Sequence, residues 1–306
     1  MNLSVVVPTL NGREELSRCL DTLAAHVPDA ETIVVNGPSA DGTTGMVRAR
    51  DDVEVLVEIA DRTINTARNA GIDRATGDAV ALLDRSFSIE DGWLDAVTDA
   101  LADAAVVTGP THRKLPAGMT TEAPEERTIA GRDVTYFNPG NVAFASHVLD
   151  ELDGFDEYLD IGGSRDLAHR LAESDHEVTW ESAMCVRSEF EADGGIRQKD
   201  WHAKYQSLTY RLVKNYGVRP TVARRVVAHA GRDAVDSLLD VIRGEADPSQ
   251  WLGTGRRVLR GTALGGKDGV TARRHDAPPR RNPNGRSARR DRAVEVYDDR
   301  DDGPTA

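Results

Sequence analysis

The chain has 306 residues, 39% of them hydrophobic, which suffices for one large α/β domain with a smaller appendage and excludes wholesale disorder. It carries 51 acidic and 38 basic residues, a net charge of −13, and only five of the basic residues are lysines. Such an acidic, lysine-poor composition is typical of a halophilic protein, because concentrated salt screens the self-repulsion; an ordinary acidic protein is the alternative.

Cysteines and apolar runs bear on the cellular compartment. Cys19 and Cys185 lie far apart without a CxxC spacing, which favours a reducing compartment over a disulfide scaffold or a zinc cluster. The chain passes from Met1 and Asn2 directly into an apolar run, which leaves no room for a signal peptide. No apolar stretch approaches the roughly 18–20 residues that cross a bilayer. We therefore expect a cytoplasmic protein.

The first 83 residues alternate between strand and helix patterns. Short β-branched runs predict strands at 3–7, 31–35, 53–59 and 78–83. Between them, apolar residues at helical spacing and turn signals predict helices at 13–27, after the turn at 39–42, and at 63–74. This alternation predicts the α/β class, with a mostly parallel sheet flanked by helices.

The pattern is looser in the second half of the chain. Strands are expected at 104–109, 141–145 and 176–180, helices at 146–152 and 164–173, and a loop at 111–126. Residues 1–198 then form the main domain. Residues 199–265 are predicted to be a C-terminal helical extension, because Leu208, Leu212 and Tyr216 share one helix face. Farther on, apolar residues are scarce and 273–292 holds eight arginines, so 266–306 is expected to be a disordered charged tail.

Small polar residues follow three of the predicted strands. They lie at 8–11, at 36–43 and at 84–86. In an open parallel sheet, ligands bind beyond the carboxyl ends of the strands, and the second segment enters a helix whose N-terminus attracts anions. No GxGxxG or GxxxxGK[ST] motif occurs. Dinucleotide-binding, P-loop and nucleotidyltransferase functions therefore lose their main support.

Six stretches of sequence, taken in order, carry a resemblance to a known family. They read VVVPTLN at 5–11, VVNGPSADGT at 34–43, ARNAG at 67–71, ATGD at 75–78 with LLD at 82–84, DGWL at 91–94, and NPGNVAF at 138–144 with GFDE at 154–157. Together they resemble the family 2 glycosyltransferases over residues 1–182. One such motif is a weak signal, whereas six in register are a specific one.

The resemblance implies a GT-A fold (the nucleotide-diphospho-sugar transferase fold), a nucleoside-diphosphate sugar donor, a divalent cation (Mg²⁺ or Mn²⁺) and usually inversion at the anomeric carbon. In this chemistry a cation neutralises the leaving diphosphate, and a carboxylate removes the acceptor hydroxyl proton. Carried over residue by residue, the resemblance assigns the nucleotide-sugar site to Pro8, Thr9, Asn11, Asn36, Arg68, Asp84 and Arg85. It also makes Asp84 a metal ligand and Asp166 the catalytic base. His202, beside Trp201, is a second candidate metal ligand, with a structural role as its alternative.

The chain departs from the family pattern at two places. The Asp-x-Asp motif reads Asp84-Arg85-Ser86, which lacks the second carboxylate and offers the Arg85 guanidinium to the phosphates instead. The Glu-Asp pair before a later helix is absent, and the segment 162–166 keeps only its final residue, Asp166, whose alternative role is that of a helix-dipole partner. An inactive pseudo-glycosyltransferase that binds or scaffolds is therefore the alternative to an active enzyme.

The expected partners are the nucleoside-diphosphate sugar and a glycan or lipid-linked glycan acceptor, and no nucleic acid. Because many relatives act on lipid-linked acceptors, peripheral contact with the inner face of the membrane is a further expectation. At molar salt the Debye length is about 3 Å, so an arginine cluster loses most of its attraction to anionic lipid. The apolar helix faces between Leu208 and Leu259 are then expected to carry the contact.

Overall fold

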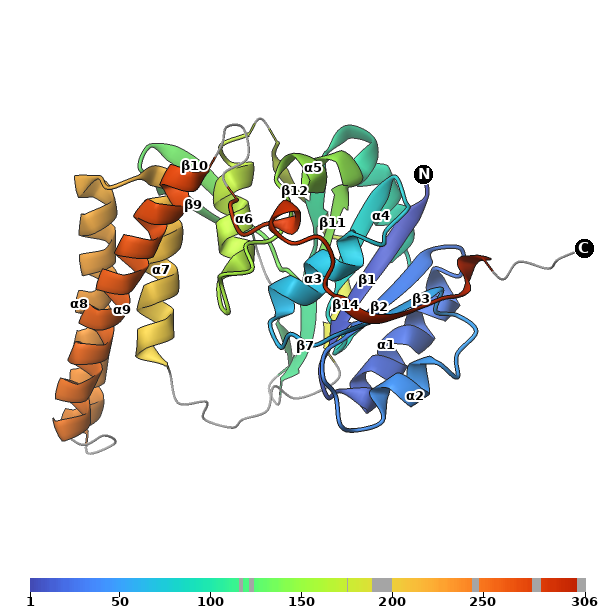
Figure 1. The fold of residues 1–306 in the computed structure, drawn as a ribbon, viewed down its shortest axis with the longest axis horizontal. Helices are drawn as coiled ribbons and strands as arrows, with labels where there is room; N and C mark the ends of the chain where they lie inside the picture. Colours follow the sequence, from blue (N-terminus) through green and yellow to red (C-terminus); the bar gives the residue numbers. More distant parts are fainter. Residues whose placement is uncertain are drawn as a thin grey trace, which may run out of the picture.

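The computed structural model describes residues 1–115, 118–120, 124–174, 176–188, 200–243, 248–276 and 282–301. Its centre is an eight-stranded sheet in the order β12-β6-β11-β4-β1-β2-β3-β14. Four parallel neighbours form the middle of this sheet: β4 (Ala79–Leu83), β1 (Leu3–Thr9), β2 (Glu31–Asn36) and β3 (Val55–Ile59). Helices flank the sheet (Figure 1). The predicted fold class is confirmed.

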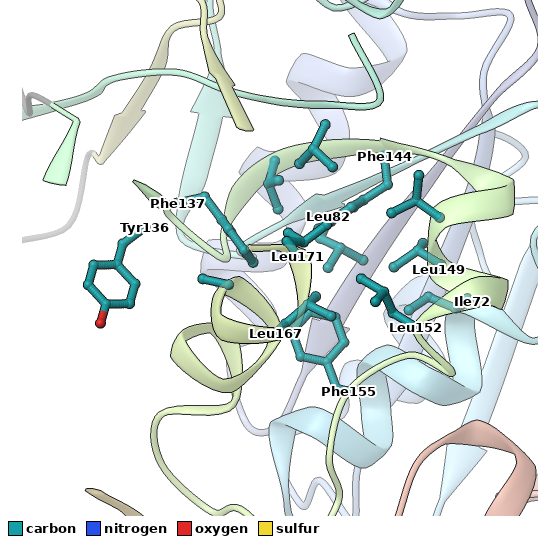
Figure 2. Packing of buried hydrophobic residues seen from close by; sticks show 14 of the residues in the cluster. Ile72, Leu82, Tyr136, Phe137, Phe144, Leu149, Leu152, Phe155, Leu167 and Leu171 are labelled. Atoms are coloured by element: carbon teal, nitrogen blue, oxygen red, sulfur yellow. The ribbon is translucent and has the colours of Figure 1, made fainter. Parts of the chain in front are cut away.

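Strand β1 shows why the early strands are unbroken apolar runs. All seven of its residues are buried; Val5 and Val7 belong to one hydrophobic core, and Val6 belongs to another. Helices α1 (Arg13–His26), α2 (Thr43–Val47) and α4 (Trp93–Asp103) contribute to the first core. Helices α3 (Ile64–Ile72), α5 (Ser146–Glu151) and α6 (Gly163–Leu171) contribute to the second. Figure 2 shows part of that second core, to which Phe144, Leu149 and Leu167 belong.

The second half of the chain adds strands to one side of the sheet and two smaller sheets. β11 (Asn141–Ala145) runs antiparallel to β4 and to β6 (Val106–Thr108), and β12 (Val178–Trp180) runs parallel to β6. A four-stranded sheet contains β5 (Phe87–Ile89), β13 (Val186–Ser188), β7 (Thr111–Leu115) and β8 (Gly118–Thr120). A hairpin contains β9 (Glu125–Ile129) and β10 (Arg132–Tyr136).

The expected loop at 111–126 is wrong where the structure describes it. β7, β8 and the start of β9 lie there, and residues 116–117 and 121–123 are outside the described residues. β7 is a strand because it pairs with β13, for example through Thr111 and Val186. Such a distant partner leaves no local periodicity in the sequence to reveal the strand.

Three long helices follow. They are α7 (Trp201–Tyr216), α8 (Pro220–Ile242) and α9 (Pro248–His275), grouped to one side of the sheet (Figure 1). As the periodicity predicts, α7 turns Leu208, Leu212 and Tyr216 into the second core. The predicted boundary at 198–199 lies outside the described residues. No helix among the described residues combines the length and apolarity needed to cross a bilayer.

The predicted disordered tail at 266–306 is wrong for most of its length. Residues up to His275 complete α9, and 282–301 cross the domain and form β14 (Ala293–Asp298) together with the short 3-10 turns Arg286–Ala288 and Asp299–Asp301. β14 pairs antiparallel with β3 as an edge strand, and the red ribbon in Figure 1 follows this path. We call residues 282–301 the C-terminal strap.

Ion pairs explain why this arginine-rich segment is ordered. The Arg292 side chain is fully buried and lies between Asp73 and Glu157. Arg286 reaches both Asp73 and Asp150 at 2.7 Å. Composition alone suggested a solvated charge run, but a buried charge is stabilised by specific partners that only the tertiary structure supplies.

Candidate functional site

The carboxyl ends of β1 and β2 bring the first predicted site residues together. Thr9 pairs in register with Asn36, and both are buried. The Asn36 side chain accepts a hydrogen bond from Ser39 Oγ at 2.6 Å and donates one to Thr44 Oγ1 at 3.0 Å. An amide can therefore occupy this position in a satisfied network, although it brings no charge to a ligand.

The loop after β1 is held by the loop after β2. Asn11 has a positive φ of 50°, a conformation that Asn tolerates better than most residues. Its backbone N–H donates to Ser39 Oγ at 2.8 Å, and its side-chain oxygen accepts from the Ala40 N–H at 2.8 Å. Pro8 precedes this loop within β1, opposite Val35. The structure thus gathers Pro8, Thr9, Asn11 and Asn36 at one edge of the sheet.

Within the described part of the chain, two buried polar atoms near this edge have no hydrogen-bond partner: Thr9 Oγ1 and Arg68 Nε. Arg68 lies on α3, and its terminal nitrogens donate at 3.3 Å to Asn65 Oδ1 and to the Pro139 carbonyl. Burial lowers the pKa of Arg68 to about 10, and the Asp84 carboxylate opposes this shift. A buried unsatisfied polar group costs about 1–3 kcal/mol, so these atoms mark the place for a polar ligand.

Asp84 follows β4 and is fixed by its neighbours. Its backbone N–H donates to the Gly140 carbonyl at 3.0 Å, and a Cβ on Gly140 would lie 2.7 Å from Asp84 Cβ, which requires glycine. Asp84 Oδ1 accepts hydrogen bonds from the Ser86 N–H at 2.9 Å and the Ser86 hydroxyl at 2.8 Å. The other carboxylate oxygen, Oδ2, is the ligand atom available to a cation. Since Mg²⁺ is often held by one or two carboxylates plus substrate phosphates, Asp84 fits a cation that the donor's diphosphate also binds.

Arg85 points its charge at another side chain. Its Nε donates to Glu15 Oε2 of α1 at 2.9 Å, and both side chains are about 30% exposed. The guanidinium also lies over Gly12, in the loop after β1. The Glu15 carboxylate offsets part of the charge that Arg85 was expected to offer to phosphates.

Asp166, the expected catalytic base, lies in a buried ionic network. Its side chain has no exposed surface; Oδ2 accepts from Lys214 Nζ at 2.8 Å and Arg170 Nε at 3.0 Å, and Oδ1 accepts from Asn215 at 2.8 Å. Burial alone would raise the pKa of Asp166, but the charges of Lys214 and Arg170 outweigh it and hold the pKa well below its usual range. A base must reach a substrate hydroxyl, so this geometry disfavours the assignment.

The loop before α6 contains a carboxylate that was not a first choice from the sequence. Asn65, in the first turn of α3, donates to the Asp156 carbonyl at 3.2 Å and the Leu159 carbonyl at 2.6 Å. These bonds hold the loop 156–162 close to α3, which also carries Arg68. Asp156 is itself buried against Lys214, whereas Asp160 is exposed. Asp160 is therefore the accessible carboxylate of this loop, near the buried ion pair of Asp156 and Lys214.

His202 lies in the first turn of α7, where its carbonyl faces Gly261 of α9. Across the described residues, three or more ligand groups converge only at Glu90, His112 and Cys185, and neither Asp84 nor His202 belongs to that group. Arg187 occupies the Glu90 carboxylate there at 2.8 Å. The geometry thus supplies no support for His202 as a ligand.

The sheet order and the loops at its carboxyl edge define the class of protein: a GT-A glycosyltransferase fold. Residues 4–146 match the family model "Glycosyl transferase family 2".

Two curated relatives bear glycosyltransferase names. "Glycosyltransferase AglE" of Haloferax volcanii is 26% identical over 195 residues, 58% of this chain and 64% of the relative. A "Pre-mycofactocin glycosyltransferase" of Mycobacterium tuberculosis is 26% identical over 219 residues, 66% of this chain and 45% of the relative. The chain therefore matches less than two thirds of the length of either relative.

Solved structures share the fold at low identity. A Pyrobaculum calidifontis mannosyltransferase in complex with GDP-Man and Mn²⁺ has a TM-score of 0.56 and 17% identity, with 86% of each chain covered. Residues 1–349 of S. aureus TarS in complex with UDP-GlcNAc give 0.61 and 15%, with 90% of this chain and 91% of that one covered.

Proposed function

We propose that the protein transfers a sugar from a nucleoside-diphosphate sugar to a hydroxyl group of a glycan or lipid-linked acceptor, with inversion at the anomeric carbon. The observation that carries the proposal is the pair of unpartnered buried atoms, Thr9 Oγ1 and Arg68 Nε, near the strand edge that carries Asp84. The glycosyltransferase names of the two relatives support transfer over a role in binding alone.

Each residue has a role in donor binding. The nucleoside would lie against Thr9, Asn11 and Asn36, and Arg68 would face the diphosphate from a buried position where water screens its charge weakly. Asp84 would hold Mg²⁺ or Mn²⁺, which when bound supplies positive charge against the leaving diphosphate. Neighbours of the same fold were solved with GDP-Man and Mn²⁺ and with UDP-GlcNAc, which agrees with such a donor site.

We assign the general base to Asp160 in place of Asp166. Asp160 is exposed, and its loop is bound to α3 through Asn65, whereas Asp166 already accepts three hydrogen bonds. An exposed carboxylate can accept the acceptor hydroxyl proton as the new sugar–oxygen bond forms.

The finer proposal for the acceptor side is contact with a membrane surface through α8. Five of its apolar side chains, spaced along one helix face, are exposed: Val227, Val235, Leu238, Leu239 and Ile242. Burial of apolar surface does not depend on charge attraction and so survives concentrated salt.

Thermal denaturation in high salt tests the donor site. A nucleoside diphosphate with Mn²⁺ at a hundredfold excess over its Kd should stabilise the native state by about 2.7 kcal/mol, a rise of several degrees in Tm. Asp84→Asn should remove the Mn²⁺-dependent part of this rise, and Asp95→Asn, an exposed carboxylate change on α4, should leave it intact. An unchanged rise in Asp84→Asn would place the cation elsewhere. No rise with uridine, guanosine or thymidine diphosphate would overturn the donor site.

A further inference from the structure

A pocket of about 630 Å³ lies among the β9–β10 hairpin, α6, α7 and α8. Six arginines line it: Arg127, Arg165, Arg211, Arg224, Arg225 and Arg232. Glu125 is the one carboxylate among the described lining residues. The whole chain carries a net charge of −13, whereas the charged side chains that line this pocket are mostly positive.

Glu125 compensates only part of this positive charge. It binds Arg165 at 2.8 Å and approaches Arg127 at 3.6 Å. No salt bridge to a carboxylate is formed by Arg211, Arg224 or Arg225 within the described ranges of the chain. These three arginines thus line the pocket without a salt-bridge partner in the described part of the chain.

Arg211 is the most constrained of the three. Its Nε is buried and has no hydrogen-bond partner in the described structure, and its Nη1 reaches Ser207 Oγ at only 3.4 Å. Burial, together with the neighbouring charges of Arg165 and Arg225, lowers the pKa of Arg211 to about 10, and the charges of Tyr136 and Asp166 oppose this shift. An isolated buried cation is costly, and a bound anion would remove that cost.

Arg211 also connects the pocket to the loop that carries Asp160. Its guanidinium lies against Gly162, where an added Cβ would come within 2.5 Å of Nη1. Gly162 has a φ of 78° and is two residues from Asp160. A group held by Arg211 would therefore lie beside the loop that carries Asp160, the general base of the proposed function.

We propose that this pocket binds a phosphate group of the acceptor, so that the acceptor is a phosphorylated molecule. Guanidinium groups match phosphate oxygens with two parallel hydrogen bonds, and six of them around one pocket suit a diphosphate. That the bound molecule is the acceptor rests on the proposed function, whereas the anion site itself rests only on the arginines that line the pocket. The phosphate can belong to a soluble compound or to a lipid headgroup.

Calorimetric titration of the full chain with inorganic pyrophosphate tests the site. EDTA is present to withhold any cation from Asp84. Arg211→Gln/Arg225→Gln should weaken binding at least tenfold, since charge-assisted hydrogen bonds are lost. Arg256→Gln/Arg257→Gln on the exposed face of α9 makes the same charge change and should bind as the parent does. Arg211→Lys/Arg225→Lys keeps the charge but loses the paired geometry, and an intermediate loss is expected if the Gln variant does not fold.

Flotation with vesicles containing phosphatidic acid separates the two sources. Flotation of the parent that the Gln variant loses supports a lipid phosphate, whereas loss of pyrophosphate binding in the Gln variant with no loss of flotation supports a soluble phosphate. Equal binding by the parent and the Arg211→Gln/Arg225→Gln variant, or no binding by the parent in either assay, overturns the anion site. The nucleotide-dependent rise in Tm should persist in the arginine variants, so failure of this site and failure of the donor site are distinguishable.

Discussion

Asp160 and Asp166 lie six positions apart in the chain and occupy opposite environments. Asp160 is exposed on a loop, and Asp166 is buried between Lys214 and Arg170. The sequence identified Asp166 as a surviving acid of a family motif but held no signal for its burial. The difference comes from Lys214, which approaches Asp166 only after α7 packs against α6.

Substitution by Asn should separate a catalytic role from a structural one. Asp160→Asn should lower turnover by roughly 10²–10⁴ and leave the unfolding free energy unchanged. Asp166→Asn should lower the unfolding free energy by about 3–5 kcal/mol, because buried cations lose their partner. Sugar transfer and denaturant unfolding measure the two effects. Full turnover in Asp160→Asn would return the role of base to another carboxylate.

The pH dependence of stability provides a control on Asp166. Its folded-state pKa lies below the unfolded value of about 3.9, so its contribution is present above that pH and is lost as pH falls through the folded pKa. The stability difference between the parent and Asp166→Asn should therefore be constant from pH 5 to 7 and shrink below pH 4. A difference that grows in acid would contradict the ion-pair assignment.

At the scale of elements, local periodicity was a reliable guide. β1 to β4 and α1 to α3 were predicted within a few residues, because their buried faces repeat at the period of the element itself. The polar residues that follow β1 and β2 lie together at one edge of the sheet, as expected, since parallel strands share one carboxyl edge. β7 and β14 were missed because each pairs with a strand far away in the chain, and β8 was missed together with its neighbour β7.

The exposed apolar side chains of α8 lead to a prediction about membrane contact. Leu238→Ser/Ile242→Ser should reduce flotation with anionic vesicles in molar salt severalfold, since each buried apolar side chain contributes about 1.5–3 kcal/mol. Val294→Ser, an equally exposed apolar change on β14, should leave flotation unchanged. A truncation at residue 265 is unsuitable here, because it would cut α9, which packs along α7. If parent and variants float equally, α8 is not the contact.

At the scale of the whole molecule, the C-terminal strap binds the two ends of the fold together. Asn282 donates to the carbonyls of Asp153 and Gly154 before the strap reaches β3. The arginine-rich composition suggested disorder because composition counts charges without their partners. Here the partners are acids distributed over the main domain.

Arg292→Met should lower the unfolding free energy by about 3–5 kcal/mol, because the carboxylates of Glu157 and Asp73 would lose the fully buried cation with which they pair. Arg290→Met, an exposed neighbour in the same segment, should change it by less than about 0.5 kcal/mol. Chemical denaturation of both variants makes the comparison. Equal stability would mean that the strap is held by β14 pairing alone.

The pairing of β14 with β3 also has a consequence for synthesis on the ribosome. Val55 pairs with Asp298, so the partner of β3 does not exist until more than 200 further residues have been translated. At about 5–20 residues per second, that interval is on the order of tens of seconds. Throughout it the nascent domain presents an unpaired strand edge, the feature that most readily recruits another chain. Slow translation therefore prolongs the period of greatest aggregation risk, and the pairing of β14 with β3 ends it.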